Sequence, residues 1–171
     1  MKKLFLFSFL IVLTTLCTYY FFPDKIIPED ISINRIVVCK SKREMVVYSN
    51  NIILKTYKIS LGKNPIGDKE FEGDNKTPEG IYFINAKNSK STCYKNLGIS
   101  YPNITDIEKA KDLGKQTGGD IKIHGIINGY GFIGKFHRWV DWTAGCIAIT
   151  DQEMDEMFNH TPIGTPIEIK P

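Results

Sequence analysis

From residue 35 onward, short runs rich in β-branched residues alternate with tight polar turns. Runs 35–40, 44–48 and 52–61 are separated by Ser41-Lys42-Arg43 and by Asn50-Asn51. β-Branched side chains suit the pleated, half-buried surface of a strand, and asparagine tolerates the backbone angles of tight turns. The pattern predicts three strands that form a meander and contribute to a core.

The rest of the chain adds strands and short helices. Further runs with strand character are 81–85, 121–123, 147–149 and 167–169. A capping box at Thr150 and Glu153 predicts a helix that ends near Phe158, and a second helix is expected at 106–113. The expected core face of the first helix is Met154, Met157 and Phe158. We therefore expect a mainly β fold with a few short helices.

A long excursion, residues 85–119, separates two of the expected strands. A long insert in a compact domain is commonly a functional loop or a lid. Tyr101 within it is a candidate to face a ligand, and the alternative that it staples the loop to the sheet stays open. The octet 73–80, with glycine at both ends and Thr77-Pro78 before a strand, predicts a structural turn.

The N-terminal segment indicates where the chain resides. Residues 4–22 carry no charge, and as a helix they would span roughly 28 Å, close to the hydrocarbon core of about 30 Å. Lys2 and Lys3 favour the cytoplasmic side, and no small-x-small cleavage site precedes Pro23. The expected organisation is a signal anchor or signal peptide at 1–22, a linker at 23–33 and an exported domain at 34–171, at the periplasmic or extracytoplasmic face.

The charge of the chain gives no reason to expect a nucleic-acid partner. The formal charge is +3, and without Lys2 and Lys3 the 22 basic residues fall to 20, against 19 acidic residues. Nucleic-acid binding needs a clustered basic face. The expected contact is instead with a membrane, through residues 4–22.

The four cysteines are Cys17, Cys39, Cys93 and Cys146. A lipoprotein anchor at Cys17 is disfavoured because the preceding Leu16 is large. Outside the membrane segment three thiols remain, so one stays free, and whether Cys39 pairs with Cys93 is left open. No spacing resembles a CxxC pair or a zinc site, so we expect no metal or cofactor and disfavour a thiol–disulfide protein.

One cysteine and one histidine, each beside a glycine at the end of a strand, form a candidate nucleophile and base. His124 follows the strand 121–123 and precedes Gly125, and Cys146 follows Gly145. A nearby histidine generates the reactive thiolate by taking its proton or by pairing with it as imidazolium. These residues suggest acyl transfer, and the alternative that both are buried structural residues stays open.

Backbone N–H groups beside the cysteine are candidates to stabilise the oxyanion of acyl transfer. The expected donors lie at Thr143, Ala144 and Gly145, and the absence of a side chain at Gly145 lets a substrate approach the backbone. Losing one such donor typically slows an enzyme by about 10²–10³.

These motifs resemble the signature of the YkuD-type L,D-transpeptidases. The family carries a histidine, a spacer and then Ser/Thr-His-Gly-Cys, as in His124-Gly125 followed by Thr143-Ala144-Gly145-Cys146. The octet 73–80 is similar to the family's Gly-Asp…Thr-Pro-x-Gly turn. The likeness covers roughly residues 35–170, and the lead-in Asp141-Trp142-Thr143 is most similar to the YafK-like branch.

The resemblance implies a β-sandwich-like catalytic domain over residues 34–171 and a peptidoglycan substrate. It implies that Cys146 attacks the diaminopimelate–D-Ala carbonyl of a tetrapeptide stem, with His124 as base oriented by the backbone carbonyl of Gly125. The acyl group would pass to an amine of another stem, to a lysine of an envelope lipoprotein, or to water. The implied location is the cell envelope, tethered to the inner membrane.

Two positions depart from the family's pattern. Ala144 replaces the usual second histidine, and Ala148 stands where many members have arginine or asparagine. The stem carboxylates therefore need other cationic partners. The candidate substrate contacts are Tyr101, His137, Arg138 and Trp142. His137 is also a rival base, and the alternative that His137 and Arg138 are solvated surface residues stays open.

Three functions remain in competition. The first is transfer of the acyl group to an amine, and the second is hydrolysis at the same site, as a carboxypeptidase or by release of a wall-attached lipoprotein. The third is a non-catalytic wall-binding envelope protein. Loss of function on Cys146→Ala is expected for both enzymes and not for the binding protein.

Overall fold

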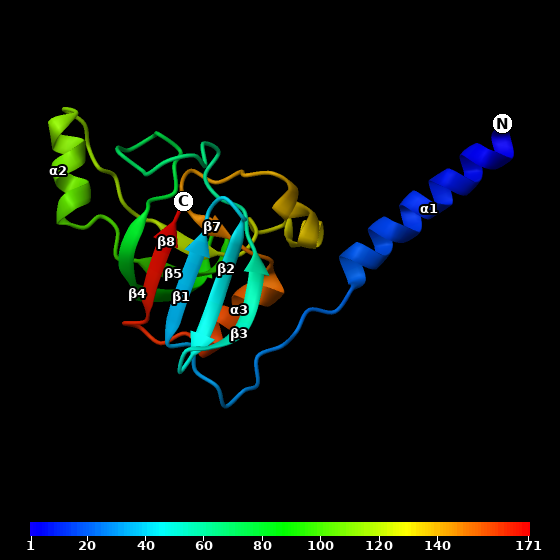
Figure 1. Ribbon diagram of the computed structural model, residues 1–171, viewed down its shortest axis with the longest axis horizontal. Coiled ribbons are helices and arrows are strands. Elements are labelled where there is room, and N and C mark those ends of the chain that lie inside the picture. Colours follow the sequence, from blue (N-terminus) through cyan, green and yellow to red (C-terminus); the bar gives the residue numbers. More distant parts are fainter.

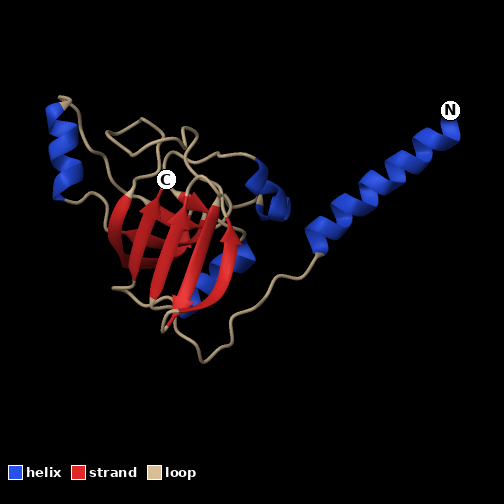
Figure 2. Ribbon diagram, viewed as in Figure 1, coloured by secondary structure: helices blue, strands red, loops and turns tan.

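The computed structural model describes residues 1–171 as one curled eight-stranded sheet with one helix packed on it and further helical segments outside it (Figures 1 and 2). The strands are β1 Arg35–Cys39, β2 Glu44–Ser49, β3 Ile52–Lys58, β4 Gly80–Ser91, β5 Tyr94–Ile99, β6 Lys122–His124, β7 Ile147–Ala148 and β8 Pro166–Lys170. The helices are α1 Lys2–Phe21, α2 Ile104–Asp112 and α3 Asp151–His160, with a 3-10 segment, η1, at Gly131–Trp139. The prediction of a mainly β fold preceded by an apolar helix is confirmed.

The sheet has the strand order β3-β2-β1-β8-β4-β5-β6-β7. The meander β1-β2-β3 is antiparallel, whereas β1 pairs with β8 and β6 pairs with β7 in parallel. Isolated bridges from Ser60 to Ala148 and from Gly62 to Thr143 connect the chain beyond β3 to the region of β7. The two ends of the sheet therefore meet, and the curl brings residues 60–62 beside residues 143–148.

The hydrophobic core lies inside this curl. Buried and half-buried residues alternate along β1 and β2, as expected for strands with one face toward a core. Helix α3 packs on β5 and β6, and Met154 and Met157 on it are fully buried, as predicted. Both hydrogen bonds of the capping box between Thr150 and Glu153 are present. All 22 buried core residues lie between residues 27 and 169, so residues 24–171 contain the complete core.

The prediction of a long excursion at 85–119 is wrong for the first half of that range. Strand β4 continues to Ser91 and pairs with β5, so residues 85–99 form a hairpin. Residues 87–91 are Lys-Asn-Ser-Lys-Ser, a sequence with weak strand propensity. Backbone pairing with β5 overrides that propensity, and the excursion that remains begins after Ile99 and carries α2.

The expected linker at 23–33 is partly built into the domain. Ile27 and Ile33 are fully buried, and the Ile33 N–H donates to the carbonyl of His160 at 2.8 Å. By contrast, α1 has no buried residue and projects away from the domain (Figure 1). Its 20 residues and mean hydropathy of 2.0 make it long and apolar enough to cross a membrane.

The neighbouring isoleucines of this segment provide a matched test. Ile27 is 1% exposed and Ile26 is 72% exposed. In residues 24–171, Ile27→Ala is expected to lower the free energy of unfolding by about 2–5 kcal/mol, because it leaves a cavity. Ile26→Ala is expected to change it by no more than about 0.5 kcal/mol. Urea unfolding followed by circular dichroism measures both, and equal effects would contradict the packing of this segment.

Candidate active site

The candidate nucleophile and base lie on neighbouring strands. Ile123 pairs with Ile147 and His124 with Ala148 across the parallel strands β6 and β7, which places Cys146 opposite Lys122. Side chains at opposing positions of a strand pair share a face, and residues two apart on one strand share it too. The register therefore places Cys146, Lys122 and His124 on one face of the sheet.

The ring of His124 is held in one orientation. Its Nδ1 lies 2.6 Å from the carbonyl oxygen of Gly125, which can only accept, so Nδ1 donates and Nε2 keeps its lone pair. The indole of Trp142 packs edge-on, with ring centroids 5.5 Å apart. Burial lowers the pKa of His124, the Gly125 carbonyl opposes this, and the Lys122 charge lowers the pKa further. The imidazole is therefore neutral near pH 7 and able to accept a proton at Nε2.

The thiol of Cys146 is not a preformed thiolate. Burial raises its pKa above the ordinary value, and this outweighs the lowering by the backbone N–H and the ammonium group of Lys122. Asp120, whose carbonyl oxygen lies 3.6 Å from the Cys146 Sγ, adds to the rise. A neutral thiol beside a neutral imidazole suits removal of the proton by a general base.

The turn before Cys146 is closed by Thr143. Its Oγ1 donates to the Cys146 carbonyl at 2.7 Å and accepts from the Gly145 N–H at 3.1 Å. The Thr143 N–H donates to the carbonyl of Leu61 at 3.1 Å. Of the three residues expected to offer backbone donors, Thr143 and Gly145 are thus already engaged. The N–H groups of Ala144 and Cys146 donate to no acceptor within the chain, which leaves this pair for an oxyanion.

Gly145 is required by both its conformation and its surroundings. Its φ of 137° is one that residues with side chains rarely adopt, and a Cβ there would lie 2.7 Å from the carbonyl oxygen of Lys76. A Cβ on Gly62 would lie 2.1 Å from the carbonyl oxygen of Asn75 and 3.1 Å from the Gly145 Cα. The loop between β3 and β4 therefore supports the nucleophile turn by direct backbone contact.

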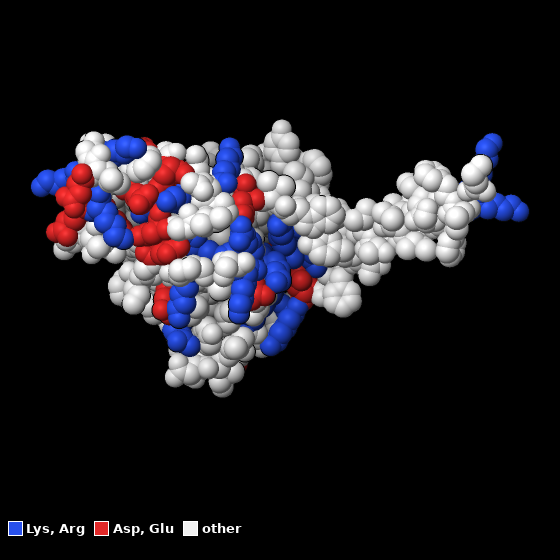
Figure 3. Space-filling model, turned by 45° about the horizontal axis from the view of Figure 1, so that its top comes forward, with Lys and Arg blue, Asp and Glu red and all other residues white.

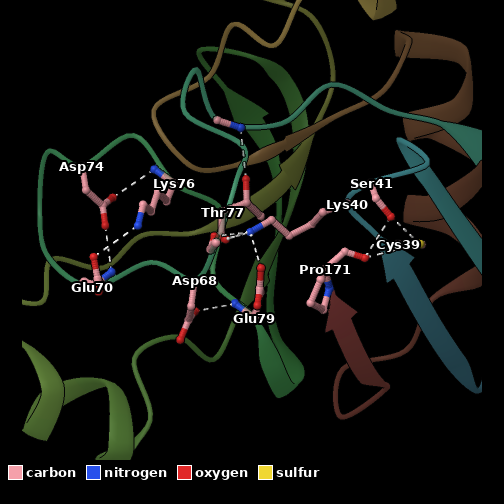
Figure 4. A network of polar contacts seen from close by, with 12 residues as sticks. Cys39, Lys40, Ser41, Asp68, Glu70, Asp74, Lys76, Thr77, Glu79 and Pro171 are labelled. Carbon is pink, nitrogen blue, oxygen red and sulfur yellow. Dashed lines mark hydrogen bonds and ion pairs between the residues drawn. The ribbon is translucent and has the colours of Figure 1, made fainter.

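Asp74 shapes this supporting loop (Figure 4). Its carboxylate accepts from the Lys69 Nζ at 2.7 Å and from the N–H groups of Glu70, Phe71 and Lys76 at 2.7, 3.2 and 2.9 Å. Burial by itself would raise the pKa of Asp74, but these four donors outweigh it and lower the pKa. The octet at 73–80 is thus built around a buried, fully bonded carboxylate.

Lys40 anchors the same loop from the end of β1, a role that no local pattern predicts. Its side chain is buried, and its Nζ donates to the Thr77 carbonyl at 2.8 Å and to the Glu79 carboxylate at 2.9 Å (Figure 4). Thr77 in turn accepts from the Gly62 N–H at 3.0 Å. A lysine next to a polar turn resembles a surface residue, and only the tertiary structure reveals that it is buried.

Two of the candidate substrate contacts are bonded to other residues of the domain. Tyr101 is buried and donates to the Thr117 carbonyl at 3.1 Å, so it staples the excursion rather than facing the thiol. The guanidinium of Arg138 pairs with Glu153 at 2.6 Å, and its side chain is only 9% exposed. Neither group is free to meet a stem carboxylate.

His137 lies behind Trp142 and is uncharged. Its Nδ1 accepts from the Trp142 indole at 3.5 Å and lies 3.2 Å from the Ser60 Oγ. Burial, with contributions from Arg138 and His124, lowers the pKa of His137 to about 3. His137 therefore supplies no positive charge near pH 7. Trp142 contacts both His137 and His124.

Lys122 is a charged residue on the same face as His124 and Cys146, and the sequence analysis did not single it out. Its side chain is 30% exposed, and its ammonium group pairs with the largely exposed carboxylate of Asp120 at 2.6 Å. The alternation of side chains along the strand 121–124 would have placed Lys122 on the same face as His124.

All four cysteines are free thiols, so Cys39 and Cys93 do not pair in this structure.

The Asp74 cluster gives a test on stability. Asp74→Asn is expected to lower the free energy of unfolding at pH 7 by about 3 kcal/mol, since it leaves the buried Lys69 uncompensated. Because the folded pKa of Asp74 is lowered, its contribution is present above the unfolded pKa and is lost as the pH falls through the folded pKa. The difference from wild type should therefore shrink in acid. Glu70→Gln, on a carboxylate 48% exposed, is the control and should change stability by under about 1 kcal/mol. Equal urea midpoints for the two variants would contradict the role of Asp74.

Several known proteins are similar to this chain in sequence or in fold over most of the domain. YafK of Escherichia coli (strain K12), which carries a provisional L,D-transpeptidase name, is 31% identical over 108 residues, covering 62% of this chain and 36% of YafK. The crystal structure of the helical cell shape determining protein Pgp2 from Campylobacter jejuni has a TM-score of 0.60 and 26% identity, over 83% of this chain and 49% of that chain. Bd1075 from Bdellovibrio bacteriovorus has a TM-score of 0.56 and 24% identity, over 85% and 50% of the two chains, and shares the fold.

The chain spans about half the length of these solved structures and about a third of the length of YafK. The family model for the YkuD L,D-transpeptidase catalytic domain matches residues 33–169. With the curled sheet and the order of its motifs, this match shows that the chain belongs to the YkuD family of L,D-transpeptidase catalytic domains.

Proposed function

We propose that this chain is a peptidoglycan L,D-transpeptidase in which Cys146 is the nucleophile and His124 is the base. The observation that carries the proposal is the bond from the His124 Nδ1 to the Gly125 carbonyl. It leaves the Nε2 lone pair available on the face of the sheet that also carries the thiol. Membership of the family supports the reaction class, and the residue roles are our proposal.

The first half of the reaction forms a thioester. The His124 Nε2 takes the thiol proton as the Cys146 Sγ attacks the carbonyl of the diaminopimelate–D-Ala bond. The oxyanion lies against the free N–H groups of Ala144 and Cys146, and each such donor is worth about 10²–10³ in rate. When the C–N bond breaks, the imidazolium returns its proton to the amine of the departing D-Ala.

The second half depends on the acceptor. His124 takes a proton from an amine of another stem, or from a lysine of an envelope lipoprotein, as that amine attacks the thioester carbonyl. The C–S bond then breaks, and the Cys146 thiolate takes the proton back from the imidazolium. Attack by water instead would leave a shortened stem. Where the stem carries a lipoprotein lysine in place of D-Ala, that lysine amine departs in the first half, and water then frees the stem from Cys146. The similarity to Pgp2, whose name records a role in helical cell shape, supports a role in shaping the wall.

Lys122 is our candidate partner for a stem carboxylate. Arg138 is paired with Glu153, and His137 is neutral near pH 7. The Lys122 ammonium lies beside the thiol, and its ion pair with the exposed Asp120 can exchange for a substrate carboxylate.

We also propose that α1 tethers the domain to the inner membrane with the site on the periplasmic face.

The reaction is tested with residues 24–171 and tetrapeptide-bearing muropeptides, with products resolved by mass spectrometry. We expect release of D-Ala and a joined product, both abolished in Cys146→Ala and reduced at least about 10³-fold in His124→Gln, because no base remains. Cys39→Ala, at a free thiol on β1, is the matched control and should keep full activity.

Other outcomes of this assay have definite meanings. A shortened stem without a joined product would show that the chain hydrolyses the thioester and does not transfer the acyl group to an amine. Freed lipoprotein from intact wall would identify the release reaction. No product from any substrate, with the thiol shown to be reduced, would overturn the enzymatic proposal in favour of a wall-binding protein.

The electrostatic role of Lys122 gives a pH test. The acid limb of kcat/KM should lie below pH 6.5, because the pKa of His124 is lowered. Lys122→Gln removes one cause of that lowering, so the acid limb should move to higher pH. KM for the tetrapeptide should also rise by about two- to fivefold, as expected for a partly exposed ion pair. Lys58→Gln, on the edge strand β3, is the control, and an identical pH profile for both variants would contradict this role.

A further inference from the structure

Large apolar side chains are exposed along one loop of the domain. This loop, residues 127–140, contains η1 and is called the aromatic loop below. Its exposed members are Ile127 (45%), Tyr130 (56%), Phe132 (73%), Trp139 (62%) and Val140 (64%). Contiguous apolar surface of this kind on a soluble domain marks a site of interaction.

The aromatic loop also encloses an apolar hollow. A pocket of about 260 Å³ is lined by Ile127, Tyr130, Ile133, Phe136 and Val140, together with residues near the candidate active site. The loop contains no aspartate or glutamate. It therefore offers apolar surface and a concavity without a carboxylate that would repel an anionic surface.

The end of α1 packs directly on this loop. The rings of Tyr19 and Tyr20 lie 5.9 and 5.5 Å from that of Phe136, and Tyr19 lies 6.0 Å from Trp139. The Tyr20 hydroxyl donates to the Phe132 carbonyl at 2.8 Å. In Figure 1 the gold turns of η1 face the end of α1 that joins the domain, and in Figure 3 the uncharged surface of α1 continues onto that side of the domain.

We propose that the aromatic loop is a membrane-docking surface, with Phe132, Trp139 and Val140 inserted at the boundary between lipid headgroups and acyl chains. A helix that spans a bilayer ends at this boundary, where tyrosine and tryptophan are enriched. Because the last turn of α1 contacts the loop, the loop lies at the same depth. Side chains that are exposed to water in the isolated domain would then be covered by lipid.

This docking would fix the orientation of the domain as well as its distance from the bilayer. His124 lies three residues before the aromatic loop, and Trp142 lies two residues after it. A loop held in the headgroup region therefore holds the candidate active site at the membrane face. The proposal rests on the membrane anchoring by α1 proposed above and on the exposed apolar surface of the loop, and it is independent of the catalytic roles.

The first experiment uses residues 24–171, which contain the complete core, so that α1 does not contribute to binding. Vesicles of phosphatidylethanolamine and phosphatidylglycerol, and vesicles of phosphatidylcholine, are sedimented with the protein. We expect binding to both that persists in high salt, because the contact is apolar. The double variant Phe132→Ser, Trp139→Ser should lower the partition coefficient at least tenfold.

Phe83→Ser is the matched control. Phe83 is 51% exposed and belongs to β4, a strand that Figure 1 shows on the side of the domain away from α1. Its loss should leave partitioning unchanged. Wild type that stays in the supernatant with both vesicle types, or a double variant that binds as well as wild type, would overturn the proposal. Conversion of a dimer to a monomer by the double variant, without lipid binding by wild type, would overturn it in favour of self-association.

A fluorescence measurement on the full chain removes any dependence on folding of the double variant. Trp139 and Trp142 are the two tryptophans. In the full chain reconstituted in vesicles with brominated lipids, we expect quenching of Trp139, seen as a quenched component that Trp139→Phe removes. Equal fractional quenching of wild type and Trp139→Phe would overturn insertion of this residue.

Discussion

The backbone contact between Gly145 and the loop before β4 is the constraint on which the candidate active site depends. A side chain on Gly145 would collide with the carbonyl of Lys76, and one on the neighbouring Gly62 would collide with the carbonyl of Asn75. This contact shapes the turn that presents Cys146 and leaves two of its N–H groups unbonded. The loop that makes the contact is itself held by two buried ion pairs, Lys69–Asp74 and Lys40–Glu79. Buried charges of this kind stabilise a structure only when they are fully bonded, and here they preserve one loop shape.

The electrostatics of the site follow from burial more than from neighbouring charges. Burial raises the pKa of Cys146 and lowers the pKa of His124, and both effects favour the neutral forms. Lys122 acts on both groups and favours the thiolate and the neutral imidazole. A neutral pair requires proton transfer during attack, so the orientation of the His124 ring matters as much as its basicity. The Gly125 carbonyl and the Trp142 indole provide that orientation.

The domain and the apolar helix are more closely connected than a tether requires. Ile27 and Ile33 pack into the core, and Tyr19 and Tyr20 pack on the aromatic loop. A flexible spacer would let the domain move freely away from a bilayer. The packed segment instead holds the aromatic loop against the end of α1, so a bilayer spanned by α1 would meet the domain at this loop. The fold and the proposed location are therefore coupled through one surface.

Local patterns in the sequence predicted the strands of the meander and the capped helix α3. They also singled out His124, Gly125 and Cys146 as motif residues. These features depend on short-range preferences, namely β-branched runs, side-chain caps and glycine beside a reactive group. The sequence by itself also indicated the β fold, the apolar helix and the family resemblance. Only the tertiary structure decided that the polar residues 87–91 form a strand, since pairing with β5 overrides their weak propensity. It also decided that Lys40 is buried and that the N–H groups of Thr143 and Gly145 are already used. These outcomes depend on contacts between residues far apart in the chain, which no local pattern specifies.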